Sequence, residues 1–240
     1  MPTIYSFNGT TKDDGYVAKF NQATWAAARD ATSGSTQVGL QSSASAIRAS
    51  KSAGRGGGFI YTVYRSFFCF DTSGITGPVS EVNIMLRGAL LGSGTPIAVQ
   101  GLAFGGDGGT SLANGDFDSI RGWSAGSSLD GLATIYGTFS GTWSTSGYNT
   151  FSDSWALRKN MQDNDVVIVC VMNYDYDYLN VEPGASFING LYYAEYTGGT
   201  RDPKIVYTLG YGNTVNGISS TNISKVNGIA RADISKINGI

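Results

Sequence analysis

Eight short segments typical of β-strands, separated by clusters of turn-forming residues, constrain the fold of this chain more than any other feature. The segments are rich in β-branched and aromatic residues, which favour strands, and Gly, Asn, Asp, Ser or Pro residues lie between them. They span residues 59–73, 79–90, 95–104, 131–141, 147–153, 165–174, 188–198 and 203–210. Many short strands at regular spacing predict an all-β fold with two packed sheets.

Two of these segments also indicate how they are covered. In 79–90, Val82, Ile84 and Leu86 alternate with polar residues, so one face of this strand should lie against the core. Segment 165–174 is apolar on both faces. We therefore expect it to be a central strand with side chains packed on either side of its sheet.

Helices should be few and short in this chain. Residues 23–31 are rich in Ala, and residues 152–161 begin with good N-cap residues, so each predicts one short helix. The intervening segment 31–58 is mostly Ala, Ser, Gly, Thr and Gln. It predicts strands around 38–40 and 46–49 that are linked by loops.

Charge and hydropathy exclude several classes of partner. The net charge is −2 and no basic run occurs, so the sequence predicts no binding to nucleic acid or to an anionic membrane surface. The first residues carry neither a basic segment nor a long apolar one, which predicts no secretory signal. The longest apolar run, residues 166–172, is too short to cross a bilayer.

The chain contains no His, which removes Ser-His and Cys-His catalytic pairs and any His-containing zinc site. The two cysteines, Cys69 and Cys170, lie inside apolar strand segments and are predicted to be reduced core residues. The 18 acidic residues are scattered, and no pair stands out for glycoside hydrolysis. We therefore predict no enzymatic activity, no catalytic residue, no metal and no cofactor.

A short repeat ends the chain. The sequences Val215-Asn216-Gly217-Ile218, Val226-Asn227-Gly228-Ile229 and Ile237-Asn238-Gly239-Ile240 recur every eleven residues. Asn-Gly is the strongest two-residue signal for a tight hairpin turn. The pattern divides the chain into a sandwich at residues 1–210 and a repeat tail at residues 211–240.

The tail has a row of apolar residues that a short hairpin cannot bury by itself. We expect these residues to anchor or oligomerise the protein by packing on other chains. The alternatives are a tail that folds back on its own sandwich and a disordered tail. The predicted interface residues are Val215, Ile218, Ile223, Val226, Ile229, Ile234, Ile237 and Ile240.

Three stretches of the sequence resemble one family. "YRSFFCFDTSGITGPVSEVNIMLRGAL" at 64–90 resembles a signature of jelly-roll sandwich modules in bacteriophage virion proteins. "GLYYAEYTGGTRDPKIVYTL" at 190–209 resembles the closing strand pair of that family, and "WAAARDATSG" at 25–34 fits the same pattern. The likeness covers about residues 10–210. The "ISKxNG" repeats resemble terminal segments of phage structural proteins.

This resemblance implies a jelly-roll virion structural protein of the tail-fibre, head-fibre or capsid-decoration type. It would be made in the host cytoplasm and then displayed on the particle, with other virion proteins as partners. A homo-oligomer is expected, and fibre proteins of this kind favour a trimer. Related sandwiches occur in carbohydrate-binding modules, so the alternative function is recognition of a host-surface glycan.

The segment "NYDYDYLN" is the first candidate ligand site. Tyr174, Tyr176 and Tyr178 alternate with Asp175 and Asp177, so an extended backbone would separate rings from carboxylates on opposite faces. In a loop, rings and carboxylates could instead converge on a sugar, since rings cover apolar C–H faces and carboxylates accept hydroxyl hydrogen bonds. Calcium binding and simple packing of the tyrosines on the sandwich rim are the other interpretations.

The loop "DFDSIRGWSAG" supplies the second candidate, Trp123, beside Asp116, Asp118 and Arg121. It could line a ligand site at the edge of the sandwich. The alternative is a loop held by hydrogen bonds between Asp and Arg side chains, with Trp123 covering the core.

Overall fold

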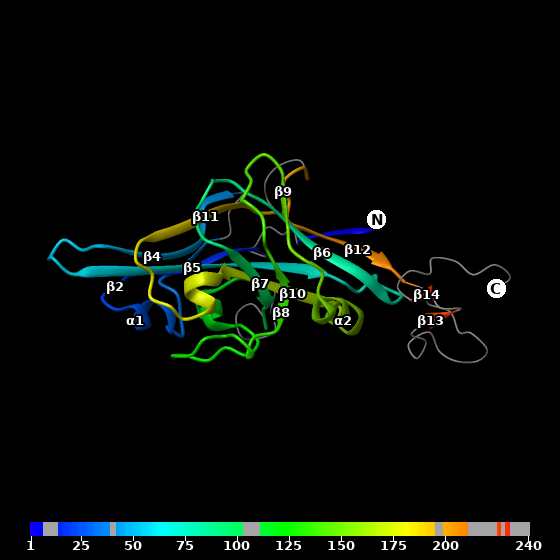
Figure 1. The fold of residues 1–240 in the computed structure, drawn as a ribbon, viewed down its shortest axis with the longest axis horizontal. Coiled ribbons are helices and arrows are strands. Elements are labelled where there is room, and N and C mark those ends of the chain that lie inside the picture. Colours follow the sequence, from blue (N-terminus) through cyan, green and yellow to red (C-terminus); the bar gives the residue numbers. More distant parts are fainter. Residues whose placement is uncertain are drawn as a thin grey trace.

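The protein is all-β, as its sequence predicts: strands make up 45% of the structure and helices 13%. The computed structural model describes residues 1–6, 14–38, 42–102, 111–194, 199–210, 225–226 and 229–230. The described strands form two antiparallel sheets and a separate two-stranded hairpin (Figure 1). The two-sheet sandwich is confirmed.

The smaller sheet has the strand order β1-β12-β6-β9, and all its pairs are antiparallel. Its strands are β1 (Thr3–Tyr5), β12 (Lys204–Leu209), β6 (Val79–Arg87) and β9 (Tyr148–Thr150). Because these neighbours are far apart in sequence, the chain crosses repeatedly between the two sheets, as it does in jelly-roll sandwiches.

The larger sheet contains eight of the described strands. Six follow the order β11-β4-β5-β10-β7-β8, and β2 joins β5 and β3 beside this path. Their bounds are β2 (Asp14–Gln22), β3 (Thr36–Val38), β4 (Ser42–Ala53), β5 (Phe59–Asp71), β7 (Pro96–Gln100), β8 (Ile135–Thr138), β10 (Val166–Asn173) and β11 (Ser186–Tyr192).

The long strand β5 changes partner along its length. Its residues 59–64 pair with β4, and its residues 66–71 pair with β10. Strand β2 pairs with β5 across both stretches, so β4 and β10 share the opposite edge of β5. Arg65 lies at the point where the sheet forks between these two partners.

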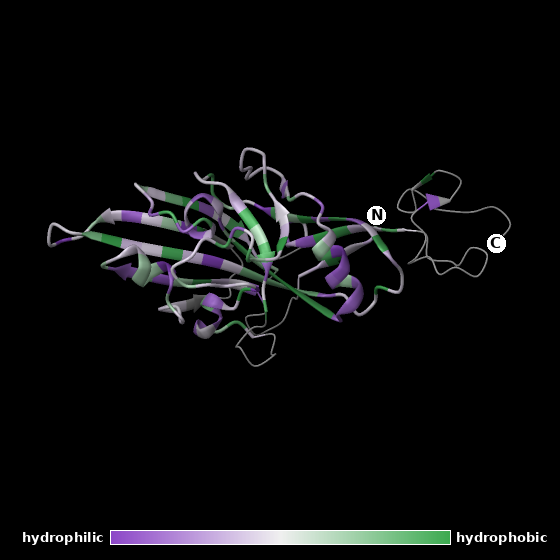
Figure 2. Cartoon of the chain, turned by 60° about the horizontal axis from the view of Figure 1, so that its bottom comes forward, coloured by the Kyte–Doolittle hydropathy of each residue, from purple (hydrophilic) through white to green (hydrophobic). Residues whose placement is uncertain are grey.

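The larger sheet is covered on both faces by apolar side chains. One face, with Phe68 and Phe70 of β5, packs against the smaller sheet and forms the inter-sheet core. The other face, with Phe67, Cys69 and Cys170, forms an outer core beneath the first helix and the loops. Strand β10 contributes to both cores, which confirms that it is a central, doubly covered strand. Figure 2 shows the alternating hydrophobic and hydrophilic bands along the strands.

Both predicted helices form. Helix α1 (Trp25–Arg29) is N-capped by Thr24, whose hydroxyl accepts a hydrogen bond from the Ala27 amide. Helix α2 (Trp155–Asp163) is capped in the same way by Ser154. Two single turns complete the helical structure: a 3-10 helix (Asn114–Asp118) and a π-helix (Tyr174–Tyr178).

Strand β2 is the main element that the sequence pattern does not predict. Its sequence mixes polar and apolar residues, yet Asp14 at its start is fully buried. The Asp14 carboxylate accepts hydrogen bonds from the Ser6 hydroxyl and the Ala194 amide. Tertiary contacts therefore make a strand from a stretch whose composition resembles a loop.

Strands β13 (Lys225–Val226) and β14 (Ile229–Ala230) form a hairpin in the tail. Val226 pairs with Ile229 across the two residues that the sequence predicts as a turn. In Figures 1 and 2 the hairpin lies beyond the end of β12, away from both sheets. Six of the predicted interface residues lie outside the described residues: Val215, Ile218, Ile223, Ile234, Ile237 and Ile240.

Candidate functional site

The segment after β10 forms a π-helical turn rather than an extended strand or an open loop. The Asn173 side chain caps it by accepting a hydrogen bond from the Tyr176 amide at 3.0 Å. The Leu179 amide donates to the Tyr174 carbonyl at 3.2 Å, which closes the turn. Because the backbone is helical, tyrosines and carboxylates do not separate onto two faces, so the extended interpretation is wrong.

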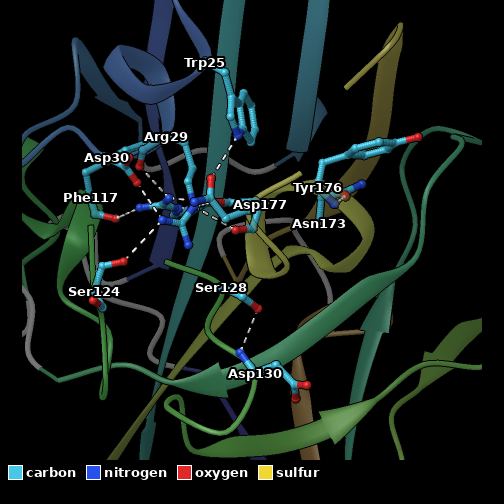
Figure 3. Close-up of polar contacts among 12 residues, drawn as sticks. Trp25, Arg29, Asp30, Phe117, Ser124, Ser128, Asp130, Asn173, Tyr176 and Asp177 are labelled. Atoms are coloured by element: carbon cyan, nitrogen blue, oxygen red, sulfur yellow. Dashed lines mark hydrogen bonds and ion pairs between the residues drawn. The ribbon is translucent and has the colours of Figure 1, made fainter. Parts of the chain in front are cut away.

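Asp177 is fully buried and forms the centre of a charged cluster (Figure 3). Arg65 donates from Nε to Asp177 Oδ2 at 2.8 Å and from Nη2 to Oδ1 at 2.7 Å, a bidentate pair. The Nε of Arg29 donates to the Asp177 carbonyl at 3.0 Å, and its Nη1 contacts Asp30 at 2.6 Å. Two guanidinium groups therefore meet two carboxylates, which balances charge around the fully buried Arg29, Arg65 and Asp177.

Aromatic rings cover this Arg29–Arg65–Asp177 cluster. The Arg65 guanidinium lies 4.1 Å from the ring centroids of both Phe117 and Trp123, and that of Arg29 lies 4.4 Å from Trp123. Backbone carbonyls of Phe117 and Ser124 accept further hydrogen bonds from the two arginines. Trp123 thus covers buried charge rather than a ligand.

Arginines from outside the loop around Trp123 hold it in place. Asp116 accepts a hydrogen bond from the Ala113 amide at 2.7 Å, within its own 3-10 turn. The arginines that fix the loop come instead from α1 and β5, and no local sequence pattern indicates that they reach it.

A pocket of about 180 Å³ lies beside the π-helical turn. Tyr174 and Tyr178 are four residues apart, so the helical backbone places both on the same side, where their rings stack with centroids 5.4 Å apart. The lining residues are Thr95, Pro96, Ile97, Asp130, Ile135, Thr138, Phe139, Tyr174 and Tyr178. We call this cavity the tyrosine pocket.

Two polar groups stand at the tyrosine pocket. The Tyr178 hydroxyl is buried and has no hydrogen-bond partner within the described structure. Burial raises the pKa of Tyr178, and the nearby Asp130 and Tyr174 raise it further, so this hydroxyl keeps its proton at neutral pH. Asp130 is exposed, and its backbone amide donates a hydrogen bond to the Ser128 hydroxyl. The neighbouring Leu129 amide donates to the Tyr178 carbonyl at 2.8 Å, which fixes this loop beside the π-helical turn.

The two remaining candidates have structural contacts. The Asp175 carboxylate accepts a hydrogen bond from the Thr95 amide at 3.0 Å and so holds one wall of the tyrosine pocket. The Tyr176 ring packs on Phe187 with centroids 4.3 Å apart, and Figure 3 shows it directed away from Asp177.

The structure therefore brings together only part of the predicted ligand set. Tyr174 and Tyr178 line one pocket, whereas Trp123 and Asp177 belong to the buried cluster. Asp130 and Phe139 complete the pocket from loops 35 or more residues earlier in the chain than Tyr174, and nothing in their own sequence surroundings marks them. Packing of the tyrosines on the rim, one of the alternatives, describes Tyr176 best.

The arrangement disfavours calcium at this turn. Asp175 and Asp177 are engaged separately, one with a backbone amide and the other with two arginines. Among the described residues, no group of three or more His, Cys, Asp or Glu side chains comes together as metal ligands. Both cysteines are buried core residues, as predicted, and burial raises the pKa of Cys170. No helix in the described ranges has the length and apolar character needed to span a bilayer.

No protein-family model matches this chain, and no curated protein is similar enough to be counted as a relative. Statements about its function therefore depend on the residues and the geometry described above.

Proposed function

We propose that this chain is a structural protein of a bacteriophage particle, of the fibre or decoration type. In this role the sandwich is displayed outward, and the repeat tail joins the protein to other copies and to other virion proteins. It acts without catalysis. The sequence resemblance at residues 64–90 and 190–209 supports the class of protein.

The observation that carries this proposal is the uncovered tail hairpin. Ile229 is 55% exposed, and β13 and β14 lie away from the sandwich. An isolated two-stranded hairpin is marginally stable at best in water. Apolar residues repeated every eleven positions gain stability when identical strands of neighbouring subunits cover them, and a trimer would supply two such neighbours.

Removal of residues 211–240 should lower the assembly state and leave the sandwich folded. The described residues of both apolar cores end at Tyr207, so the unfolding free energy of the body should change by less than about 1 kcal/mol. Light scattering should show the mass fall from that of an oligomer to that of a single chain. A full-length variant with Lys225→Ala, which alters the same hairpin at an exposed polar position, serves as the control.

A truncated protein that keeps the mass of the full chain and still enters particles would contradict the anchoring role. A truncated protein that no longer folds would contradict the division of the chain at residue 210.

A second candidate function is recognition of a host-surface glycan, and the tyrosine pocket is the observation that favours it. Stacked rings offer a flat apolar surface for the C–H face of a sugar. Beside them, the exposed Asp130 carboxylate can accept hydrogen bonds from sugar hydroxyls. A pocket of about 180 Å³ accommodates one sugar unit rather than a long chain segment.

On an array of host-surface polysaccharides, binding by the parent protein should weaken at least about tenfold with Tyr174→Ala or Asp130→Asn, a loss of about 1.4 kcal/mol. Tyr178→Phe should leave glycan binding nearly unchanged, because this buried hydroxyl is out of reach of a ligand and has no partner in the described structure. Tyr5→Ala removes a half-exposed ring elsewhere and is the control. If the parent binds no glycan, the structural role remains alone.

A further inference from the structure

Trp155, the first residue of helix α2, is 67% exposed, although tryptophan usually buries most of its ring. The cap by Ser154 fixes the start of the helix, and Leu157 and Met161 turn toward the inter-sheet core. Two residues along a helix correspond to about 200°, so Trp155 projects from the side opposite Leu157. The helix therefore holds this ring out in solvent by its geometry.

A groove of about 350 Å³ runs beside this indole. One wall is α2, and the other comes from the end of β7, the segment before β8 and the loop at Arg121. The lining residues are Gln100, Arg121, Thr134, Trp155, Ala156, Lys159, Asn160, Asp163 and Asn164. We call it the Trp155 groove. Its only apolar side chains are the indole and Ala156.

The polar groups of the Trp155 groove are positioned by one another. The Asn160 Oδ1 accepts hydrogen bonds from Gln100 Nε2 at 3.3 Å and from Asn164 Nδ2 at 3.1 Å. The Asn160 Nδ2 donates to the Ala156 carbonyl at 3.2 Å. Side-chain amides held in this way present fixed donors and acceptors, which are suited to sugar hydroxyls.

Among the charged groups of the described residues, one cation in the groove has no carboxylate partner. Lys159 and Asp163 neutralise each other as an i, i+4 pair at 2.5 Å. Arg121 is exposed, and within the described ranges no carboxylate pairs with its guanidinium. A guanidinium binds a carboxylate through two parallel hydrogen bonds, so the groove is complementary to a carboxylate group.

We infer that the Trp155 groove binds an acidic saccharide, with a uronate ring stacked on Trp155 and its carboxylate paired with Arg121. The indole supplies the flat apolar surface, the guanidinium supplies the charge, and the amides of Gln100 and Asn160 bind the ring hydroxyls. A single unpaired cation is too little for a polyanion such as nucleic acid, which requires several phosphate contacts. This site is separate from the tyrosine pocket and does not depend on the virion role.

Calorimetric titration of the full chain tests the site, with tetramers of galacturonate, mannuronate and guluronate as probes. Carboxyl-reduced forms of the same tetramers are the neutral controls. At least one uronate tetramer should bind, and Trp155→Ala and Arg121→Gln should each weaken its binding at least about tenfold. Leu91→Ala removes an equally exposed apolar side chain, at 66%, and should have no effect.

Fluorescence gives a second measurement on the unaltered protein. Trp25 and Trp143 are buried and Trp123 is partly covered, so iodide quenching reports mainly on Trp155. Bound uronate should protect this fluorescence. The inference is overturned if no uronate tetramer binds at roughly 1 mM, or if the reduced tetramers bind equally well. It is also overturned if uronate binding survives both Trp155→Ala and Arg121→Gln. Binding that only Tyr174→Ala abolishes would place the uronate in the tyrosine pocket and would overturn the inference in the same way.

Discussion

Asp177→Asn should destabilise the protein by about 3–5 kcal/mol, the usual cost of removing one partner from a buried ion pair. The substitution leaves two buried guanidinium groups, of Arg65 and Arg29, and one carboxylate. That carboxylate, of Asp30, pairs with Arg29. For a chain of this size the loss corresponds to a decrease in melting temperature of roughly 6–20 °C. Urea unfolding, followed by tryptophan fluorescence, measures it directly.

Asp175→Asn is the matched control, because it changes the same residue type two positions away in the same turn. The Asp175 carboxylate accepts one hydrogen bond from a backbone amide, so its loss should cost only about 1 kcal/mol. A double variant, Arg65→Met with Asp177→Leu, should be more stable than either single change, since no buried charge is then left unpaired. Equal unfolding midpoints for Asp177→Asn and Asp175→Asn would show that the cluster does not stabilise the fold as argued.

Gly122→Ala should have the second-largest effect, a destabilisation of about 3 kcal/mol. Gly122 has φ of +80°, a conformation that costs an L-residue free energy, and an added Cβ would lie 2.1 Å from the Leu132 carbonyl oxygen. The loop between these residues carries Trp123 and Asp130. Displacing it would disturb both the cover of the arginine cluster and the tyrosine pocket, so glycan binding should fall with stability.

Gly126→Ala separates backbone strain from the steric clash with Leu132. Gly126 has a similar φ of +75°, but nothing lies within 4 Å of the added Cβ. It should cost only about 1 kcal/mol, from backbone strain alone. Thermal unfolding of both variants gives the comparison. If Gly126→Ala proves as costly as Gly122→Ala, close packing against Leu132 does not limit this loop.

The parts of the fold that the sequence predicts are those with a local signal. The alternation of Val82, Ile84 and Leu86, the doubly apolar β10 and the helix start at Ser154 are all patterns within a few residues. Strand β2 could not be predicted in this way, because an Asp such as Asp14 ordinarily indicates a loop. Its buried carboxylate accepts hydrogen bonds from residues 8 and 180 positions away, which no local pattern indicates.

The candidate site follows the same rule. Two tyrosines at i and i+4 could be paired only once the backbone was known to be helical, whereas the sequence indicated either an extended strand or a loop. Arg65 lies 112 residues before Asp177, so the charge partner that removes Asp177 from ligand binding has no signature in the segment itself. Asp130 lies at the pocket because the neighbouring Leu129 amide donates a hydrogen bond to the Tyr178 carbonyl, a contact between distant parts of the sequence.

The fork in β5 has a consequence for how the molecule opens. A sheet whose central strand exchanges one neighbour for another at Arg65 could separate into two independently opening units, one on β4 and β11 and the other on β10, β7 and β8. The Arg65–Asp177 pair, bridged to α1 through Arg29, ties the turn after β10 to β5 at that junction, and the β10 half cannot separate without leaving a charge unpaired in apolar surroundings. The π-helical turn at the end of β10 should therefore open only when that half of the sheet unfolds.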